Sequence, residues 1–524
     1  MFSGLTDWWR LARAGLRLSR HDALIPAEYA SALPAPLPTL GALSRIGART
    51  RDGERSLRPG ERLAAAFEAM SPPYVKLGQM MATRPDIIGF DMASDLGRLQ
   101  DRMPPFSKEA AIAEIEKTFN AKLDDLFTEF SGPIAAASIA QVHKAVLKNG
   151  KTVAVKVLRP NIEEDVHREF RAFARAARTA EGVSKLARRM EPVKFIKTLD
   201  DAASIELDLR MEAGAASALA DILLDHERII IPDVHWDLTS RRVLTVDWID
   251  GVSVNDHKAL DAQGVDRSQL AVDILQSFLT QALHHGFFHA DMHQGNILID
   301  AEGRIVLIDF GIMGRLDDLA RRTFAEIMHG FISRDYQRTA KAHFDAGYVS
   351  REHSLEAFAQ ALRAVGEPLY GQSADRMDMS RVLQQLFDVT DLFDMHLRPE
   401  LVLLQRTMVT VEGVARDLDP EVNMWEAAKP VVKSYITDAV GPRRQVERLR
   451  EATEKALDIA PLLPRYLEQI GEASARVSDD RLGLSHQTTE DLAQALGRQG
   501  QMTRRAIWFA GFAMIALALA VGLT

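Results

Sequence analysis

The sequence contains no cysteine at any of its 524 positions. This absence excludes disulfide bonds, thiolate zinc sites and cysteine nucleophiles, and it is compatible with a reducing compartment. The chain also has no excess of positive charge, since its formal net charge is -9 and its pI is near 6.0. Without an overall basic field, nucleic acid is not an expected partner. A chain of this length can hold several domains, because about 100 to 200 residues per domain is usual.

Export is not expected, since no charged segment in the first residues precedes an apolar run with a cleavage site. Residues 1–20 instead predict an amphipathic helix, in which apolar residues recur at helical spacing beside a stripe of arginines. The apolar set is Leu5, Trp8, Trp9, Ala12 and Leu16, and the basic set is Arg10, Arg13, Arg17 and Arg20. Such a helix can lie in a membrane interface or pack on the protein's own core, and both interpretations stay open.

The last residues, Ala506–Thr524, are apolar and carry no charge. At about 1.5 Å per residue, a helix of this length approaches the thickness of the hydrocarbon core of a bilayer. Arg498, Arg504 and Arg505 precede it, so the positive-inside tendency places the bulk of the chain in the cytoplasm. We therefore expect a single-pass C-terminal transmembrane helix in the cytoplasmic membrane, with a buried core helix as the alternative.

Three oxygen-bearing side chains in segment 289–311 indicate phosphoryl transfer. Asp291 lies in a polar loop, Asn296 follows it, and Asp309 ends the short apolar strand Ile305–Ile308. Phosphoryl transfer requires a carboxylate near the attacking oxygen and hard oxygen ligands for Mg²⁺. The pattern D-x-x-x-x-N followed by D-F-G is typical of the catalytic half of a kinase. His289 and His293 flank Asp291, and because no third nitrogen ligand lies nearby we favour structural roles for them over metal binding.

The segment before this one predicts a nucleotide-binding small lobe. A small-residue loop comprises Ile134, Ala135, Ala136, Ala137, Ser138, Ile139, Ala140, Gln141 and Val142. A hairpin turn at Asn149-Gly150 then leads to the strand-like run Thr152–Val157, whose Lys156 would point inward. Small side chains let backbone N–H groups approach phosphates, and the lysine supplies a matching charge. A solvated lysine on an edge strand is the alternative.

Segment 204–213 predicts a helix with three carboxylates, namely Glu206, Asp208 and Glu212. Glu212 is the favoured partner for Lys156, with Glu206 as the alternative, although a solvated acidic face would show the same pattern. Further on, Val243–Gly251 reads as a strand that runs into a turn. In a kinase this turn would be the hinge, so the backbone of Asp247 and Ile249 is expected to meet the adenine edge.

These signals divide the chain into six parts. They are a basic amphipathic helix and linker (1–59), an N-terminal helical extension (60–130), a small lobe (131–255), a mostly helical large lobe (256–477), a spacer (478–505) and a membrane anchor (506–524).

The motifs in this order resemble the UbiB/ADCK family of atypical kinase-like proteins. The resemblance rests on the KxGQ block Lys76–Gln79, the alanine-rich loop, Val153–Lys156, the ExD block Glu206–Asp208, His289–Asn296 and Asp309–Gly311. Their joint occurrence over about residues 60 to 320 is far more specific than any single motif. The alanine-rich loop departs from ordinary protein kinases, in which the corresponding loop is rich in glycine.

The resemblance implies an α+β, protein-kinase-like two-lobed fold with a helical extension folded over the active site. Lys156 would contact phosphates, Glu212 would orient Lys156, and Asp291 would be the catalytic acidic residue. Asn296 and Asp309 would hold Mg²⁺ beside ATP or ADP. Lys76 and Gln79 would lie near Glu206 and Asp208, where a protein substrate would otherwise enter.

The resemblance also implies an ATPase or small-molecule kinase that supports ubiquinone biosynthesis at a membrane. The implied partners are membrane lipids, polyprenyl phenol or quinone precursors and other proteins of ubiquinone biosynthesis. Three alternatives remain. They are a nucleotide-gated scaffold that organises or extracts lipid intermediates, an ordinary protein kinase, and an aminoglycoside- or choline-type phosphotransferase, which shares the Asp and Asn spacing but not the KxGQ block.

Overall fold

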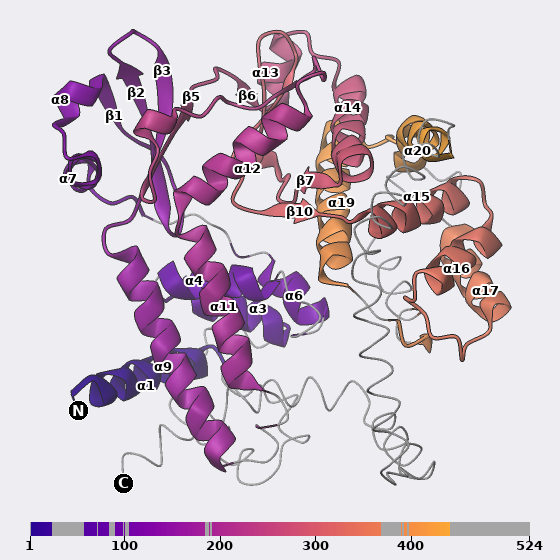
Figure 1. Cartoon of the computed structure of the whole chain (residues 1–524), viewed down its shortest axis with the longest axis horizontal. Helices are drawn as coiled ribbons and strands as arrows, with labels where there is room; N and C mark the ends of the chain where they lie inside the picture. Colours follow the sequence, from indigo (N-terminus) through magenta and orange to yellow (C-terminus); the bar gives the residue numbers. More distant parts are fainter. Residues whose placement is uncertain are drawn as a thin grey trace, which may run out of the picture.

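The computed structural model describes residues 2–23, 57–70, 72–82, 88, 90–97, 99, 104–183, 188, 191–367, 389, 392–395 and 398–440. Within these residues the chain forms two lobes and a group of N-terminal helices, all visible in Figure 1. The arrangement mixes helices and sheets, as the sequence predicts for an α+β fold.

The small lobe is built on a four-stranded antiparallel sheet of order β1-β2-β3-β5. Its strands are β1 (Phe127–Ala136), β2 (Ala140–Leu147), β3 (Thr152–Leu158) and β5 (Val243–Asp247). The turn between β2 and β3 contains Gly150 at φ +84°, a conformation that glycine adopts without steric cost. Along β3, Val153, Val155 and Val157 are fully buried and pack with Ile115. Because side chains alternate between the two faces of a strand, Lys156 points to the opposite face.

Two short helices, α7 (Lys108–Phe119) and α8 (Leu123–Leu126), precede the sheet, and α7 supplies the Ile115 of that outer core. Between β3 and β5 the described residues include three α-helices. They are α9 (Ile162–Val183), α11 (Pro192–Glu206) and α12 (Leu209–Ile222). In Figure 1, α12 runs from the small lobe towards the large lobe, whereas α9 and α11 extend away from both.

The N-terminal helices pack against α9 and α11 and share one hydrophobic core with the small lobe. They are α1 (Phe2–Arg20), α3 (Pro59–Glu68), α4 (Pro72–Ala82) and α6 (Phe90–Leu96). That core joins Phe67 of α3 and Leu77 of α4 to Leu158 of β3 and Leu244 of β5. A buried polar network adds to it, because Glu169 of α9 accepts a hydrogen bond from the Tyr74 hydroxyl (2.8 Å) and pairs with Arg10 (2.7 Å).

The large lobe surrounds the helix α14 (Arg267–Thr280), and on the buried face of this helix Phe278 packs edge-on against Phe288. Its helices are α13 (His257–Ala262), α14 (Arg267–Thr280), α15 (Asp318–Ile332), α16 (Tyr336–Asp345), α17 (Leu355–Gly366), α19 (Pro399–Leu418) and α20 (Met424–Val440). Several begin at a side chain that accepts a hydrogen bond from the first turn, which satisfies an otherwise unpaired N–H group. These N-cap residues are Asp256, Asp266, Asp317, Asp335 and Ser354.

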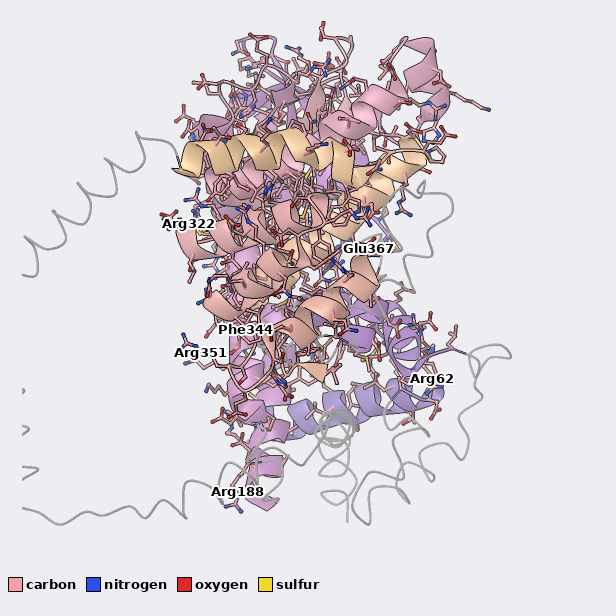
Figure 2. The ribbon with its side chains drawn as sticks, turned by 90° about the vertical axis from the view of Figure 1, so that its right-hand side faces the viewer. Arg62, Arg188, Arg322, Phe344, Arg351 and Glu367 are labelled. Carbon is pink, nitrogen blue, oxygen red and sulfur yellow. The ribbon has the colours of Figure 1, made fainter. Side chains whose placement is uncertain are left out.

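Short strands line the side of the large lobe that faces the small lobe. They are β4 (Ile229–Ile230), β6 (Val252–Ser253), β7 (Phe287–His289), β8 (Ile297–Ile299), β9 (Ile305–Leu307) and β10 (Met313–Arg315). They form one sheet of order β4-β9-β8-β6 and one pair of β10 with β7. In the view of Figure 2, α20 lies above the N-terminal helices, which carry Arg62.

Two predicted features differ from the structure. The single helix expected over Ser204–Ala213 is two helices, because α11 ends at Glu206 and Asp208 caps α12 by accepting the Arg210 N–H (3.1 Å). The loop expected over Ile134–Val142 is also shorter, because β1 extends to Ala136 and β2 begins at Ala140. Three small residues of this segment, Ala135, Ala136 and Ala140, therefore lie in paired strands and not in a loop.

The N-terminal helix packs on the protein with one face and leaves part of its predicted apolar stripe exposed. Leu11, Ala14 and Leu18 are buried, whereas Trp9 is 60% and Leu16 is 58% exposed. No helix within the described ranges is long and apolar enough to cross a bilayer. The apolar segment Ala506–Thr524 lies outside the described residues, so the C-terminal anchor stays a prediction.

Gly78 of α4 allows α3 and α4 to pack closely. A Cβ atom at this position would lie 2.3 Å from Cδ1 of Leu99 and 2.7 Å from Cδ2 of the buried Phe67. We expect Gly78→Ala to destabilise the N-terminal helices by about 1–3 kcal/mol, because the core would be overpacked. The midpoint of urea unfolding measures this loss. Gly413→Ala in α19 is the matched control, since nothing lies within 4 Å of its Cβ position. That change should stabilise by roughly 0.5–1 kcal/mol through helix propensity, and an equal loss in both variants would contradict the packing argument.

Candidate active site between the lobes

Lys156 of β3 lies at the centre of a cluster of charged side chains between the lobes. Its Nζ is 2.7 Å and 2.9 Å from the two carboxylate oxygens of Glu212 on α12. It is also 3.2 Å from Oδ2 of Asp309, which follows β9 of the large lobe. Of the two candidate partners in the sequence, Glu212 is therefore the one that contacts Lys156. One ammonium group joins the small-lobe sheet, the helix beside it and the large lobe.

The second carboxylate, Glu206, forms an ion pair with Lys76 of α4 instead. This contact places the KxGQ block beside the junction of α11 and α12. Asp208 serves as the N-cap of α12 and is 2.6 Å from the guanidinium of Arg210. Gln79 lies on the same helix as Lys76 and is partly buried. The N-terminal helices thus reach the edge of the cluster, and the Lys76 charge acts on Glu212.

Burial and charge compete in setting the protonation of this cluster. Burial alone would raise the pKa of Asp309, but the charge and hydrogen bond of Lys156 outweigh it and lower the pKa to about 2. Burial likewise favours neutral Lys156, yet the carboxylates of Asp309 and Glu212 hold its pKa above the ordinary value. For Glu212, burial is the largest influence and its pKa is raised. The lysine is consequently charged at neutral pH, with Asp309 as its ionised partner.

Asp309 has a backbone conformation that is uncommon for a residue with a side chain. Its φ is +62°, in the left-handed region that aspartate adopts more readily than most other residues. Its Oδ1 accepts a hydrogen bond from the Gly311 N–H (3.3 Å), while Oδ2 faces Lys156. Local strain of this kind clusters at functional sites. The turn after β9 therefore aims the carboxylate into the space between the lobes.

Asn296 holds the loop that carries Asp291. Its side-chain N–H donates to the backbone carbonyl of Asp291 (3.0 Å), so its amide oxygen is left for another partner. Asn296 is also linked to the strand that ends at Asp309, because its carbonyl accepts the Ile308 N–H (3.1 Å). The structure thus brings Asp291, Asn296 and Asp309 together through adjoining backbone, as the loop and two strands in the sequence predict.

His289 is a structural residue of this loop. Its Nδ1 accepts the Asp291 N–H (3.1 Å), and its Nε2–H donates to the Ile308 carbonyl (3.1 Å). These two bonds require the neutral ring, and burial lowers the His289 pKa in agreement. His293 is half exposed, accepts the Gly295 N–H at Nδ1 (3.0 Å) and places Nε2 3.7 Å from Oδ2 of Asp291.

The connection between β1 and β2 is held by a residue that the sequence does not single out. Arg159, just after β3, donates to the Ala137 carbonyl from Nε (3.2 Å) and from a terminal nitrogen (2.9 Å). Gln141 is fully buried, and its side chain bonds to His143 (2.9 Å) and to the Phe106 N–H (3.0 Å). Ser138 and Ala140 are also fully buried, whereas Ile134 is 52% exposed, so the β1 part of the predicted loop presents a side chain to the surface and its centre does not.

In the segment predicted to be the hinge, the side chain of Asp247 is already paired, so a ligand would have to contact the backbone there. The Asp247 carboxylate is 2.7 Å from both Lys151 and His235. Its N–H donates to the Asp233 carbonyl (2.9 Å), and the Trp248 N–H donates to the Thr152 carbonyl (3.1 Å). These bonds use the N–H groups of Asp247 and Trp248. Of the two backbone contacts predicted for adenine, the one at Asp247 therefore could not be made through its N–H group, and the one at Ile249 stays a prediction.

The side chains at this site suit Mg²⁺ bound together with phosphates. Asn296 and Asp309 offer an amide and a carboxylate oxygen, which are the hard ligands that Mg²⁺ prefers. In the part of the chain that the structure describes, no group of three or more His, Asp or Glu residues could hold a metal by itself. Mg²⁺ commonly binds through one or two protein ligands, with phosphate and water supplying the rest. The residues present fit such an ion.

Comparisons with known proteins agree with these motifs. The family described as the ABC1 atypical kinase-like domain matches residues 98–343, and the UbiB helical domain matches residues 362–423. The curated protein "Probable protein kinase UbiB" of Shewanella piezotolerans is 37% identical over 414 residues, which cover 78% of this chain and 75% of the relative. A solved structure, the complex of Rv3197 with erythromycin from Mycobacterium tuberculosis, is 21% identical with a TM-score of 0.49. It covers 75% of this chain and 97% of that chain.

Removing the central ammonium should leave two carboxylates facing each other. We expect Lys156→Met to destabilise the protein at neutral pH by about 1–3 kcal/mol, because Glu212 and Asp309 lose their common partner. The lowered pKa of Asp309 means that its ion pair contributes stability above its unfolded pKa of roughly 3.9, and that this stability is lost as the pH falls towards 2. The difference between wild type and variant should therefore shrink below about pH 5, as protonation relieves the repulsion.

Urea unfolding at several pH values measures this difference. Lys148→Met, at an exposed lysine next to the β2–β3 turn, is the control and should change stability by less than about 0.5 kcal/mol. A loss for Lys156→Met that does not depend on pH would show that packing of the lysine stem, and not its charge, stabilises the cluster.

Proposed function

The chain belongs to the UbiB family of ABC1 atypical kinase-like proteins, and from this premise we propose that it hydrolyses ATP or phosphorylates a small molecule in support of ubiquinone biosynthesis. The proposed reaction takes place at a membrane with ATP or ADP and Mg²⁺ bound between the lobes. The observation that carries this proposal is the contact of Lys156 with both Glu212 and Asp309, with Asp291 on the adjoining loop.

Each side chain of the site has a distinct role in this proposal. Lys156, oriented by Glu212, contacts the phosphates of the nucleotide. Asn296 and Asp309 hold Mg²⁺, which when bound neutralises negative charge on the phosphates. Asp291 accepts a hydrogen bond from the attacking hydroxyl or water and takes its proton as the bond to phosphorus forms. His289 keeps the backbone of Asp291 fixed to the strand that precedes Asp309.

The position of the N-terminal helices favours a small acceptor over a protein. Lys76 of α4 pairs with Glu206, at the start of the helix junction that positions Glu212. A protein kinase needs this side of the site open for a polypeptide segment, whereas water or a small phenol needs less room. An ordinary protein kinase remains the alternative that the name of the Shewanella relative suggests for that protein. Phosphorylation of a protein partner in trans, lost with Lys156→Ala, would support it.

Asp291→Asn tests the proposed chemistry. We expect the full-length variant in detergent to release phosphate from ATP at least about 100-fold more slowly than wild type, because an amide cannot take the proton. Its affinity for ATP should stay close to the wild-type value, since the phosphate-contacting and Mg²⁺-binding residues are unchanged. Phosphate release and isothermal calorimetry measure the two quantities.

Glu302→Gln, at an exposed carboxylate between β8 and β9, is the matched control and should retain full activity. Unchanged phosphate release by Asp291→Asn would remove Asp291 from the chemistry.

A second comparison separates the enzyme from a nucleotide-gated scaffold. If turnover of ATP is required, Asp309→Asn should fail to restore ubiquinone in a deficient strain. The quinone profile of cells that lack the protein would show which step of the pathway it serves.

The exposed face of α1 supports contact with lipid. Trp9, Arg13, Leu16 and Arg20 follow one another at helical spacing, and all four are exposed. The Arg13 guanidinium lies 4.0 Å from the centre of the Trp9 ring. Aromatic and aliphatic side chains interleaved with arginines are typical of helices that lie in a membrane interface. Together with the apolar segment Ala506–Thr524, this face would hold the site close to polyprenyl precursors.

Vesicle binding tests the contribution of α1 apart from the C-terminal segment. A chain that ends at Gly500 should cosediment with vesicles rich in anionic lipid. Trp9→Ala combined with Leu16→Ala should weaken that binding several-fold, since less apolar surface enters the interface. Trp236→Ala, at an equally exposed tryptophan of the small lobe, serves as the control and should bind like wild type. Equal binding by all three chains would exclude the outer face of α1 as the lipid contact.

A further inference from the structure

We propose that Thr407 of α19 is a positioning residue that holds the backbone of Asp291 in place for phosphoryl transfer. This inference rests on the proposed function, since it concerns the same reaction. The match to the ABC1 atypical kinase-like domain ends at residue 343, whereas the match to the UbiB helical domain, residues 362–423, includes Thr407. The inference therefore gives a helix outside the kinase-like match a role in the reaction.

The Thr407 side chain contacts the residue before Asp291. Its hydroxyl is fully buried and donates to the Ala290 carbonyl (3.0 Å). The Leu403 carbonyl, one turn earlier in α19, is also within reach of this hydroxyl (2.8 Å). In an α-helix that carbonyl already accepts the N–H of the residue four positions later, so it has a partner without the hydroxyl. Among the residues that the structure describes, the Ala290 carbonyl has no donor other than Thr407.

The Ala290 carbonyl and the Asp291 N–H belong to one peptide group, which is held at both ends. Its oxygen accepts from Thr407, and its N–H donates to Nδ1 of His289 (3.1 Å). The next peptide group is held through the Asp291 carbonyl, which accepts the Asn296 side-chain N–H (3.0 Å). Because peptide groups are planar, fixing the two that flank Asp291 fixes both of its backbone dihedral angles. The direction in which its carboxylate leaves the backbone depends on these angles.

Of these three partners, Thr407 is the one that lies outside the loop that carries Asp291. His289 and Asn296 lie at the two ends of this loop, so their hydrogen bonds define its shape. The Thr407 bond instead spans 117 positions of the chain and joins the loop to the 20-residue helix α19. The hydroxyl therefore determines where the loop lies relative to the helical part of the large lobe.

A hydrophobic core holds α19 in this position. Leu404 and Val411 lie one turn before and one turn after Thr407 on the same side of the helix, and both are buried in the core that includes Ala290 and Met292. Figure 1 shows α19 beside β7 and β10, the strands that flank this region. Away from water a hydrogen bond is stronger, and a carbonyl left without a donor is costly.

A second contact joins α19 to the same loop. The Asp417 carboxylate, about 15 Å further along the helix, accepts a hydrogen bond from the Gln294 side chain (2.9 Å). It also lies 3.1 Å from Nε2 of His257. The Asp417 side chain is 44% exposed, so water can take its place if this contact is lost. The buried hydroxyl of Thr407 has no such substitute, and the positioning role is assigned to it.

Thr407→Val tests this role, because valine has nearly the shape of threonine but no hydroxyl. We expect the full-length variant in detergent to release phosphate from ATP about tenfold to 100-fold more slowly, since a small displacement of a catalytic group has an effect of this size. Its affinity for ATP should change less than about twofold, because the positioning of Asp291 acts on the transition state and not on the bound nucleotide. Thr407→Ser keeps the hydroxyl and should retain at least about a third of the wild-type kcat. Phosphate release and calorimetry measure the two quantities.

Hydrogen exchange of the same variants gives a readout that does not depend on activity. The Asp291 N–H lies at the other end of the peptide group that Thr407 holds, so it should exchange about tenfold faster in Thr407→Val. Peptides that cover β8 should exchange at the wild-type rate, which separates release of the loop from a general loss of stability.

Thr410→Val is the matched control on the same helix. The Thr410 hydroxyl donates to the Arg406 carbonyl one turn earlier (3.1 Å), as Thr407 can to Leu403, but within the described chain it makes no hydrogen bond to the loop that carries Asp291. Its substitution should leave phosphate release, ATP affinity and exchange of the Asp291 N–H unchanged.

The outcomes separate this inference from the proposed function. Wild-type turnover by Thr407→Val overturns the inference, as does slow turnover by Thr407→Ser, which would assign the effect to packing of the methyl group. Equal losses of turnover and ATP affinity, with faster exchange throughout the large lobe, would show general destabilisation and overturn it too. A wild-type protein that releases no phosphate contradicts the proposed function, whereas exchange of the Asp291 N–H still decides whether Thr407 holds the loop. Should Thr407→Val fail to fold, Thr407→Ala, which also lacks the hydroxyl, takes its place with the same expectations.

Discussion

The ion cluster around Lys156 is the contact on which the relation of the two lobes depends. Glu212 comes from a helix of the small lobe and Asp309 from a strand end of the large lobe, and one ammonium group reaches both. The pKa of Lys156 is held high and that of Asp309 low, so both groups are charged and attract each other at neutral pH. The proposed function assigns the phosphate and Mg²⁺ contacts to these same groups. Under that proposal, a change in the alignment of the lobes would also change the geometry of the catalytic side chains.

The N-terminal helices belong to this arrangement and do not simply cover it. Glu169 of α9 links Tyr74 of α4 with Arg10 of α1, and Lys76, two residues after Tyr74, pairs with Glu206. A set of contacts therefore leads from Arg10, on the side of α1 that faces α9, to the helix junction beside Glu212. A change in how α1 is held can reach the active site through rigid helices, provided that these helices have two arrangements.

The sequence predicts the parts of this molecule that depend on local spacing. Strand β3, the Asn149-Gly150 turn and the grouping of Asp291, Asn296 and Asp309 follow from alternation, turn chemistry and short separations, and the family comparisons confirm the kinase-like fold. The break between α11 and α12 was not predicted, because a cap such as Asp208 looks like any helical carboxylate. Arg159 was missed for a different reason. It bonds to the Ala137 carbonyl, 22 residues earlier in the chain, and only packing reveals which of many arginines makes such a contact.

The shared core of the N-terminal helices and the small lobe restricts how this architecture can change. Leu158 and Leu244 of the sheet are buried partly by helices that precede the kinase-like region. A shorter chain without those helices would expose a contiguous apolar surface, which favours aggregation. A kinase-like region separated from these helices would therefore need another protein to cover the same apolar surface.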